Sequence, residues 1–181
     1  MKYIHFITFC LLATLSFSQV NIEISGQVIN HTGQEIYLTR TEGKQSVTHL
    51  TAKLDKDGKF EMKGSVPDPD YYVLKINDKS SVNLVLQGDD KIQIYTDENN
   101  VVDFTNILGS QSSQNIHHFL KEFSAYRTQI DQVQNQIKAN PAAKDSLTKV
   151  STQISRNFNF TRDRFARNNA NSPGLIVILN L

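Results

Sequence analysis

The apolar residues of this 181-residue chain change their spacing once, near residue 110, and that change constrains the fold more than any motif does. Before that point they recur at every second position, which places them on one face of extended strands. The alternating residues form eight short runs: Val20–Ile24, Ile36–Leu38, Leu50–Leu54, Phe60–Val66, Tyr72–Ile76, Val82–Leu86, Ile92–Ile94 and Val102–Phe104. Eight short strands separated by turns predict an antiparallel β-sandwich or barrel.

Two segments between these runs carry turn residues. Asp55-Lys56-Asp57-Gly58 ends in an Asp-Gly pair, which suits the positive φ angles of a tight turn. We therefore expect a hairpin in which Phe60–Val66 returns along Leu50–Leu54. Pro67 and Pro69 interrupt the strand pattern because proline has no amide hydrogen to donate to a neighbouring strand.

After a serine cluster at 110–113 the apolar spacing becomes helical, and the serines are suitable N-caps. One apolar stripe consists of Ile116, Phe119, Leu120, Phe123, Ile130, Val133 and Ile137. Asn140-Pro141 ends it, and a second stripe consists of Leu147, Val150, Ile154, Phe158 and Phe165. This pattern predicts an αα-hairpin that packs against the sheet or against another domain. Ser172-Pro173 then predicts the start of a third helix, so the fold class is α+β.

Residues 1–18 have the features of a secretory signal peptide. Lys2 provides a positive charge, residues 4–15 are apolar, and Ser16 and Ser18 are the small residues that a signal peptidase recognises. We therefore expect an exported protein, located in a bacterial periplasm or else on the outer surface or secreted, with no membrane span after cleavage. The predicted parts are the signal at 1–18, an antiparallel β domain at 19–109 and a helical connector at 110–181.

Removal of the signal would also remove Cys10, the only cysteine of the chain. The exported chain could then form no disulfide and could perform no thiol chemistry. Beyond residue 18 the chain has 18 basic and 18 acidic residues and no long block of one sign. This balance argues against nucleic acid as a partner, since nucleic-acid binding depends on neutralising phosphates.

Several short segments resemble those of a known family. They are Gly26-Gln27-Val28, Ile36-Tyr37-Leu38, Asp57-Gly58-Lys59-Phe60, Tyr71-Tyr72-Val73-Leu74 and Leu86-Gln87-Gly88-Asp89. Together they resemble the N-terminal domain of unknown function that precedes the thioredoxin-like domain in bacterial periplasmic thiol-disulfide oxidoreductases and AhpC/TSA-type proteins. Residues 104–119 and Asn171-Ser172-Pro173 are similar to the connecting region of those proteins.

The resemblance implies a non-catalytic accessory module that positions a redox domain, mediates dimerisation or recognises a substrate protein. The Cys-x-x-Cys site of the longer proteins has no counterpart here, so no catalytic residue is carried over. The sequence ends at Leu181, just after the apolar run Leu175–Leu179, a stretch that we expect a partner to cover. We therefore expect either a member truncated before its thioredoxin-like domain or a stand-alone module.

Two histidines and several aspartates are the candidates for metal binding or catalysis. His117 and His118 are neighbours on a predicted helix and point about 100° apart, so a metal site would also need His31 or His49 and a carboxylate. In Asp55-Lys56-Asp57-Gly58 the glycine is fourth, whereas an EF-hand calcium loop has it sixth, so a turn is the better interpretation. The remaining aspartates, which could pair as in a glycoside hydrolase but suit turns better, are Asp68, Asp70, Asp89 and Asp90.

Aromatic and basic side chains provide two further candidates. A sugar- or peptide-binding platform would need several tyrosines on one face, from among Tyr37, Tyr71, Tyr72, Tyr95 and Tyr126. A solvated helix face, or a contact surface for an acidic partner, is indicated by Arg156, Arg162, Arg164 and Arg167 beside Asp163.

The main functional hypothesis is a binding, scaffolding or dimerisation module without chemistry of its own. It needs no cofactor or metal, and its partner is a thioredoxin-like domain in the same chain or in a partner chain, with a homo-oligomer as a further option. The alternatives are a stand-alone β-sandwich that binds a peptide or carbohydrate, and a hydrolase that uses carboxylates. A third hypothesis is protein assembly through the apolar tail and the helical hairpin.

Overall fold

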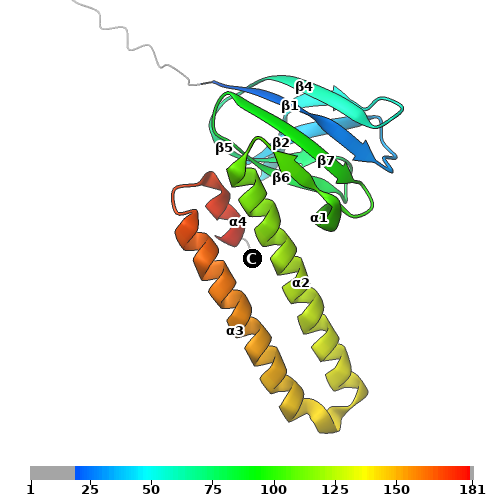
Figure 1. Ribbon diagram of the computed structural model, residues 1–181, viewed down its shortest axis with the longest axis vertical. Coiled ribbons are helices and arrows are strands. Elements are labelled where there is room, and N and C mark those ends of the chain that lie inside the picture. Colours follow the sequence, from blue (N-terminus) through cyan, green and yellow to red (C-terminus); the bar gives the residue numbers. More distant parts are fainter. Residues whose placement is uncertain (1–18, 180–181) are drawn as a thin grey trace, which may run out of the picture.

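Eight strands form two four-stranded sheets that pack face to face, and helices follow them, as the fold class predicts (Figure 1). The computed structural model describes residues 19–179, so the predicted signal segment 1–18 lies outside the described residues. The strands are β1 (Val20–Ile29), β2 (Glu35–Glu42), β3 (Gln45–Lys53), β4 (Lys59–Val66), β5 (Asp70–Lys75), β6 (Ser81–Leu86), β7 (Asp90–Asp97) and β8 (Asn106–Leu108).

The strand orders are β4-β1-β7-β8 in one sheet, here the β1 sheet, and β3-β2-β5-β6 in the other, the β2 sheet. Most neighbours are antiparallel, but β1 and β7 run parallel with Ile24 opposite Ile92. A parallel pair needs a long connection between its strands, and here the whole β2 sheet is part of that connection. Between the sheets lie the inward side chains of the alternating strands, such as Ile24, Ile94, Leu38 and Leu84, all of them fully buried.

The predicted strand at Val102–Phe104 is wrong. Val101–Phe104 forms a short helix, α1, in which the side chain of Asn100 accepts a hydrogen bond from the Asp103 amide. Phe104 is 64% exposed, so its apolar character does not mark a core position. The capping bond of Asn100 outweighs the weak alternation of two apolar residues. The eighth strand instead follows as β8, whose Ile107 is buried opposite Ile94.

The predicted pairing across the Asp-Gly turn is also wrong. Gly58 has the expected positive φ of 74°, and the Asp55 carboxylate accepts hydrogen bonds from the Asp57 and Lys59 amides. However, β3 and β4 belong to different sheets, so the turn carries the chain from one sheet to the other. A Cβ atom at Gly58 would lie 2.0 Å from the Val28 carbonyl oxygen, so this glycine is needed for close approach to β1.

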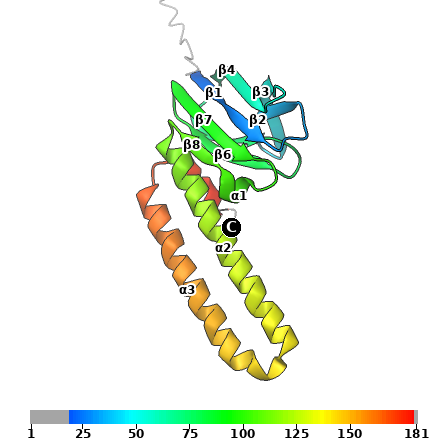
Figure 2. The same ribbon diagram turned by 45° about the vertical axis from the view of Figure 1, so that its right-hand side comes forward.

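The predicted helical hairpin is confirmed. Its helices are α2 (Gln111–Ala139) and α3 (Lys144–Asn168), joined by a 3-10 turn, η1 (Pro141–Ala143). Ser110 caps α2 by accepting a hydrogen bond from the Ser113 amide. A second 3-10 turn, η2 (Pro173–Leu175), leads into α4 (Ile176–Leu179). Ser172 caps the start of η2, as expected. Both views show that the hairpin projects away from the sandwich, with only its base next to the sheets (Figures 1 and 2).

Candidate functional site

A second apolar core joins the helices to the outer face of the β2 sheet, and we call it the junction core. It contains Val85 of β6, Ile116 and Phe119 of α2, Phe165 of α3 and Val177 of α4, each no more than 9% exposed. Val85 points away from the core between the sheets, so strand β6 is covered on both faces. The junction core is therefore the place where the sandwich holds the helical hairpin.

Two serine side chains fasten α2 to the edge of the β2 sheet. The Val85 amide donates to the Ser113 hydroxyl at 2.9 Å, and the Val85 carbonyl oxygen lies within 3.3 Å of Ser113 Oγ and 3.4 Å of Ser110 Oγ. The two hydroxyls are 2.8 Å apart and share a hydrogen bond. Strand β6 is an edge strand, so these serines satisfy backbone groups for which the sheet has no further strand.

The apolar segment at 175–179 packs in part on the same core. Val177 is 7% exposed within the junction core, whereas Ile176 is 46% exposed. The preceding Gly174 approaches α2 so closely that a Cβ atom there would lie 2.3 Å from Ile116 Cδ1. The chain itself therefore covers Val177, and Ile176 remains available to a partner.

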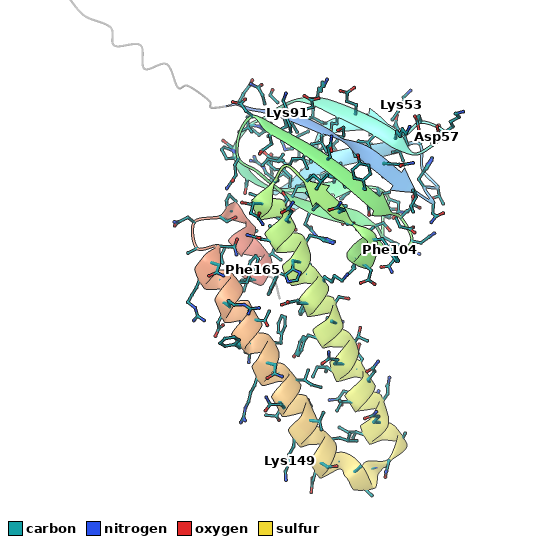
Figure 3. The ribbon with its side chains drawn as sticks, in the orientation of Figure 1. Lys53, Asp57, Lys91, Phe104, Lys149 and Phe165 are labelled. Carbon is teal, nitrogen blue, oxygen red and sulfur yellow. The ribbon has the colours of Figure 1, made fainter. Side chains whose placement is uncertain are left out.

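Stacked aromatic rings join α2 and α3, beginning in the junction core and continuing along the hairpin. Phe119 stacks on Phe165 with ring centroids 4.5 Å apart, and Tyr126 stacks on Phe158 at 4.4 Å. Phe123 lies 5.5 Å from Phe158 and completes the stack. Figure 3 shows Phe165 near the base of the hairpin. Pairs of this geometry stabilise a contact beyond the area they bury, so the base of the hairpin is its most firmly packed part.

A polar groove of about 160 Å³ lies between α2 and α3 over Phe119 and Phe165. His118 Nε2 lies 3.2 Å from Glu122 Oε1 at its rim, and Arg164 lines the α3 side. His118 is largely exposed, so this contact contributes little. The groove offers hydrogen-bond donors and acceptors to a polar or charged ligand, and none of the residues that line it is a serine or cysteine nucleophile.

The structure does not bring the four candidate histidines together. His117 is half-buried on α2, and burial lowers its pKa, with a further lowering from Lys121 and His118. His31 contacts the Gly33 carbonyl oxygen at 2.9 Å, and His49 packs edge-on against Tyr72. Among residues 19–179, no group of three or more histidine, cysteine, aspartate or glutamate side chains is placed to hold a metal ion.

The candidate aspartates bond to backbone amides in turns and to one arginine. Hydrogen bonding to the Lys59 amide lowers the pKa of the Asp55 carboxyl, the opposite of what a general acid needs at neutral pH. Asp90 accepts a hydrogen bond from the Gln87 amide at 2.6 Å. Asp68 and Asp70 lie 3.0 and 3.5 Å from Arg40, which also pairs with Glu42. These contacts fit the turn interpretation of the aspartates.

The candidate tyrosines do not share a face. Tyr72 is fully buried between the sheets, and burial at the junction core raises the pKa of Tyr71 to about 12. Tyr37 and Tyr95 are exposed but belong to different sheets, while Tyr126 stacks within the hairpin. The candidate arginines do lie along one helix, α3, where Arg162 pairs with its neighbour Asp163 at 3.2 Å.

Sequence reasoning missed the junction core and its serines. One signal was present, because Leu84, Val85 and Leu86 are consecutive apolar residues in a strand that otherwise alternates. Such a run indicates a strand that is buried on both faces. The partner of the second face could not be read from the strand, because it lies 28 residues further along the chain at Ser113.

Together these features define a class of protein, an eight-stranded β-sandwich that carries a projecting helical hairpin on one outer face. Residues 22–116 match the model of the DUF4369 family, described as a domain of unknown function, and the match spans more than half of the chain. The chain therefore belongs to the DUF4369 family. No match was found among curated proteins or among solved structures.

The family match ends inside the first turns of α2. It includes Val85 and both serines that hold it, whereas the rest of the hairpin lies beyond it. No helix in the described part of the chain is both long and apolar enough to span a membrane.

Proposed function

We propose that this chain is a non-catalytic accessory module that binds or positions a partner protein in the bacterial cell envelope. The observation that supports this most directly is the shape of the molecule, a helical hairpin attached only at its base to a well-packed sandwich (Figures 1 and 2). Such a hairpin exposes most of its surface without weakening the core that carries it. The second support is that the candidate aspartates bond to turn amides and to Arg40.

The proposed partner is a thioredoxin-like redox domain, in the same chain or in a second one. Membership of the DUF4369 family agrees with the resemblance to a domain of unknown function, because the resembling segments 26–28, 57–60, 71–74 and 86–89 all lie within the family match. The redox partner itself is part of the proposal. The chain has no cysteine after Cys10, so any thiol chemistry of the pair would come from the partner.

Export supplies a first test. We expect the protein recovered from the periplasm to begin at Gln19, because Ser16 and Ser18 are the small residues that precede signal cleavage. Mass spectrometry of the intact protein measures this directly. A mature protein that keeps residues 1–18, with Cys10 reactive toward a thiol reagent, would contradict both the location and the thiol-free state.

A redox assay supplies the second test. The purified chain from Gln19 onward should show no turnover in a thiol-disulfide exchange assay, alone and after prior reduction. A thioredoxin-like domain added to isotopically labelled chain should shift amide resonances of the described residues. Turnover by the chain alone, or unchanged resonances at a large excess of the added domain, would sink the proposal. The full-length chain with Cys10→Ala is the matched control for any thiol that the leader contributes.

A further inference from the structure

The two parts of the molecule carry opposite net charges, although the total charge is near neutral. Residues 19–110 contain nine basic and fourteen acidic residues, a net charge of −5. Residues 111–181 contain nine basic and four acidic residues, a net charge of +5. The sandwich is therefore acidic and the hairpin basic to the same extent, so the molecule has a large electric dipole along its length.

The positive charge of α3 is concentrated on its outer face. Lys149, Arg156, Arg164 and Arg167 are spaced by seven, eight and three residues, which places them along one line of the helix together with Phe160. All five side chains are exposed, and we call this line the basic stripe. The opposite line of α3 carries Phe158 and Phe165, which pack on α2, so most of the stripe faces away from α2, while Arg164 also borders the groove between the two helices.

The basic stripe has little opposing charge of its own. Asp163 lies in it and pairs with Arg162, and within residues 19–179 no salt bridge to Lys149, Arg156, Arg164 or Arg167 is present. The guanidinium of Arg164 lies 5.9 Å from the ring centre of Phe160, which is 63% exposed. An exposed arginine beside an exposed aromatic ring is a combination that is enriched at protein interfaces.

An acidic counterpart occurs at one end of the sandwich. The end of β4 and the starts of β1, β5 and β7 lie at this end. Val20 of β1 lies opposite Val66 of β4, and Asp70 of β5 lies opposite Leu86 of β6, which β7 follows. Its carboxylates are Glu42, Asp68, Asp70, Asp89 and Asp90. Arg40, Lys44 and Lys91 reduce the net charge of this end to −2, the same as that of the opposite end, and its first three acids pair with Arg40. What distinguishes this end is its position relative to α3. We call this surface the acidic end.

We propose that the basic stripe of α3 binds the acidic end of a second copy of this chain, in an antiparallel dimer that contains the contact twice. Both views place α3 and the start of β1 on the same side of the molecule (Figures 1 and 2). A two-fold axis at right angles to the hairpin then sets each stripe against the other copy's sandwich and opposes the two dipoles. Such an interface is closed, so it ends at two copies.

The stripe is about as long as the sandwich measured along its strands. The stripe runs 18 residues from Lys149 to Arg167, about 27 Å at the helical rise, and Figure 3 shows Lys149 near the tip of the hairpin. Strand β7, which begins at the acidic end and crosses the sandwich, spans about 23 Å. This inference does not depend on a redox partner, since both surfaces belong to this chain.

Sedimentation and light scattering of the purified chain test the dimer. We expect a dimer at about 0.05 M salt and dissociation toward monomer at about 0.5 M, because salt screens contacts between exposed charges. The triple variant Lys149→Glu, Arg156→Glu, Arg164→Glu should raise the dissociation constant by roughly tenfold or more. The matched control is Lys53→Glu, Lys56→Glu, Lys59→Glu, which makes the same charge change at the other end of the sandwich and should leave a dimer.

A mixture of complementary variants gives the sharpest result. The variant Glu42→Lys, Asp68→Lys alone should be monomeric, like the stripe variant alone, whereas the mixture of the two should form a heterodimer with both contacts restored. Circular dichroism checks that each variant is folded. If the lysine variant is not, the milder Glu42→Gln, Asp68→Asn should still weaken the wild-type dimer.

Three results would overturn the inference. They are a wild-type monomer at low salt and at the highest soluble concentration, a dimer that the stripe variant does not weaken, and a monomer whose stripe binds vesicles of anionic phospholipid instead.

Discussion

Glu98 is a buried carboxylate that joins three loops at one end of the sandwich. It accepts hydrogen bonds from the Thr32 amide at 2.9 Å and the Thr32 hydroxyl at 2.5 Å. Its own backbone bonds to Ile29 and to the hydroxyl of Ser80. Burial raises the pKa of this carboxyl. The hydrogen bonds, chiefly those from Thr32, act in the opposite direction and outweigh burial, so the net pKa is below the ordinary 4.5. The folded state therefore favours the ionised form.

This lowered pKa predicts acid sensitivity. The stabilisation from Glu98 is fully present above the ordinary carboxyl pKa of 4.5 and is lost as the pH falls through the lower folded value. We expect Glu98→Gln to reduce the free energy of unfolding at pH 7 by about 1–3 kcal/mol, because the amide cannot accept both bonds from Thr32 as a carboxylate does. Denaturant titrations at a series of pH values measure it.

The acid-dependent loss of stability should be smaller in Glu98→Gln than in the wild type. The control is Asp78→Asn, an exposed carboxylate in the β5–β6 turn, which should leave both the stability and its pH dependence close to the wild-type values. A pH profile of Glu98→Gln that matches the wild type below pH 4.5 would refute the role of this carboxylate.

At the scale of elements, α3 contains two phenylalanines with opposite surroundings. Phe165 is 9% exposed and stacks on Phe119, whereas Phe160 is 63% exposed. We expect Phe165→Ala to reduce the free energy of unfolding by about 3 kcal/mol, because it opens a cavity where the hairpin meets the sandwich. Urea unfolding followed by the helical circular dichroism signal measures this change.

Phe160→Ala is the matched control on the same helix, and at about 0.5 M salt, where we expect the chain to be monomeric, the change should be within about 0.5 kcal/mol. Equal effects of the two substitutions would mean that the junction core does not hold α3.

The local elements were largely predictable, and their partners were not. Ser110, Pro141 and Ser172 act through neighbours a few residues away, so capping and helix-breaking rules locate the helices correctly. The turn at Gly58 was also found, but whether its two strands pair depends on β1 and β2, which lie far away in sequence. Alternation shows which face of a strand is buried without showing which strand lies beside it. The parallel pairing of β1 with β7 is invisible to the same reasoning.

At the scale of the whole molecule, the sandwich and the hairpin differ in packing. The sandwich core holds twenty buried residues, including Ile24 and Ile94 at its centre, whereas Val133 is the one buried apolar residue in the described part of α2 beyond Phe119. We expect the amides of β1 and β7 to exchange with solvent slowest and those around η1 fastest, since local opening needs less energy where few apolar contacts are lost.

Hydrogen exchange followed by mass spectrometry resolves these segments. The amides of α2 next to Ser113 should be protected more than those near Ala139, although both lie in one helix. Uniform protection along α2 would show that the projecting part is held by more than the contacts described.

The candidate site was less predictable than the fold because it depends on long-range arrangement. The arginines of α3 were recognisable as a charged face, but the opposite charge of the sandwich is spread over many loops and strands. The junction core likewise combines residues from β6 and three helices that are far apart in the sequence. The boundary predicted near residue 110 is sufficient for counting the charge of each part, whereas the whole-chain balance alone hides the division.

The hydrogen bonds of Ser110 and Ser113 to Val85 also have a consequence for aggregation. A bare edge strand can recruit the same strand from another molecule and so seed fibrous aggregates. Since Ser110 and Ser113 occupy the amide and carbonyl of Val85 in β6, another strand cannot pair at that residue while α2 stays docked. The docked hairpin therefore hinders polymerisation by strand pairing. A mutation that detaches it would expose an edge strand that can pair with other molecules, and it would also reduce stability.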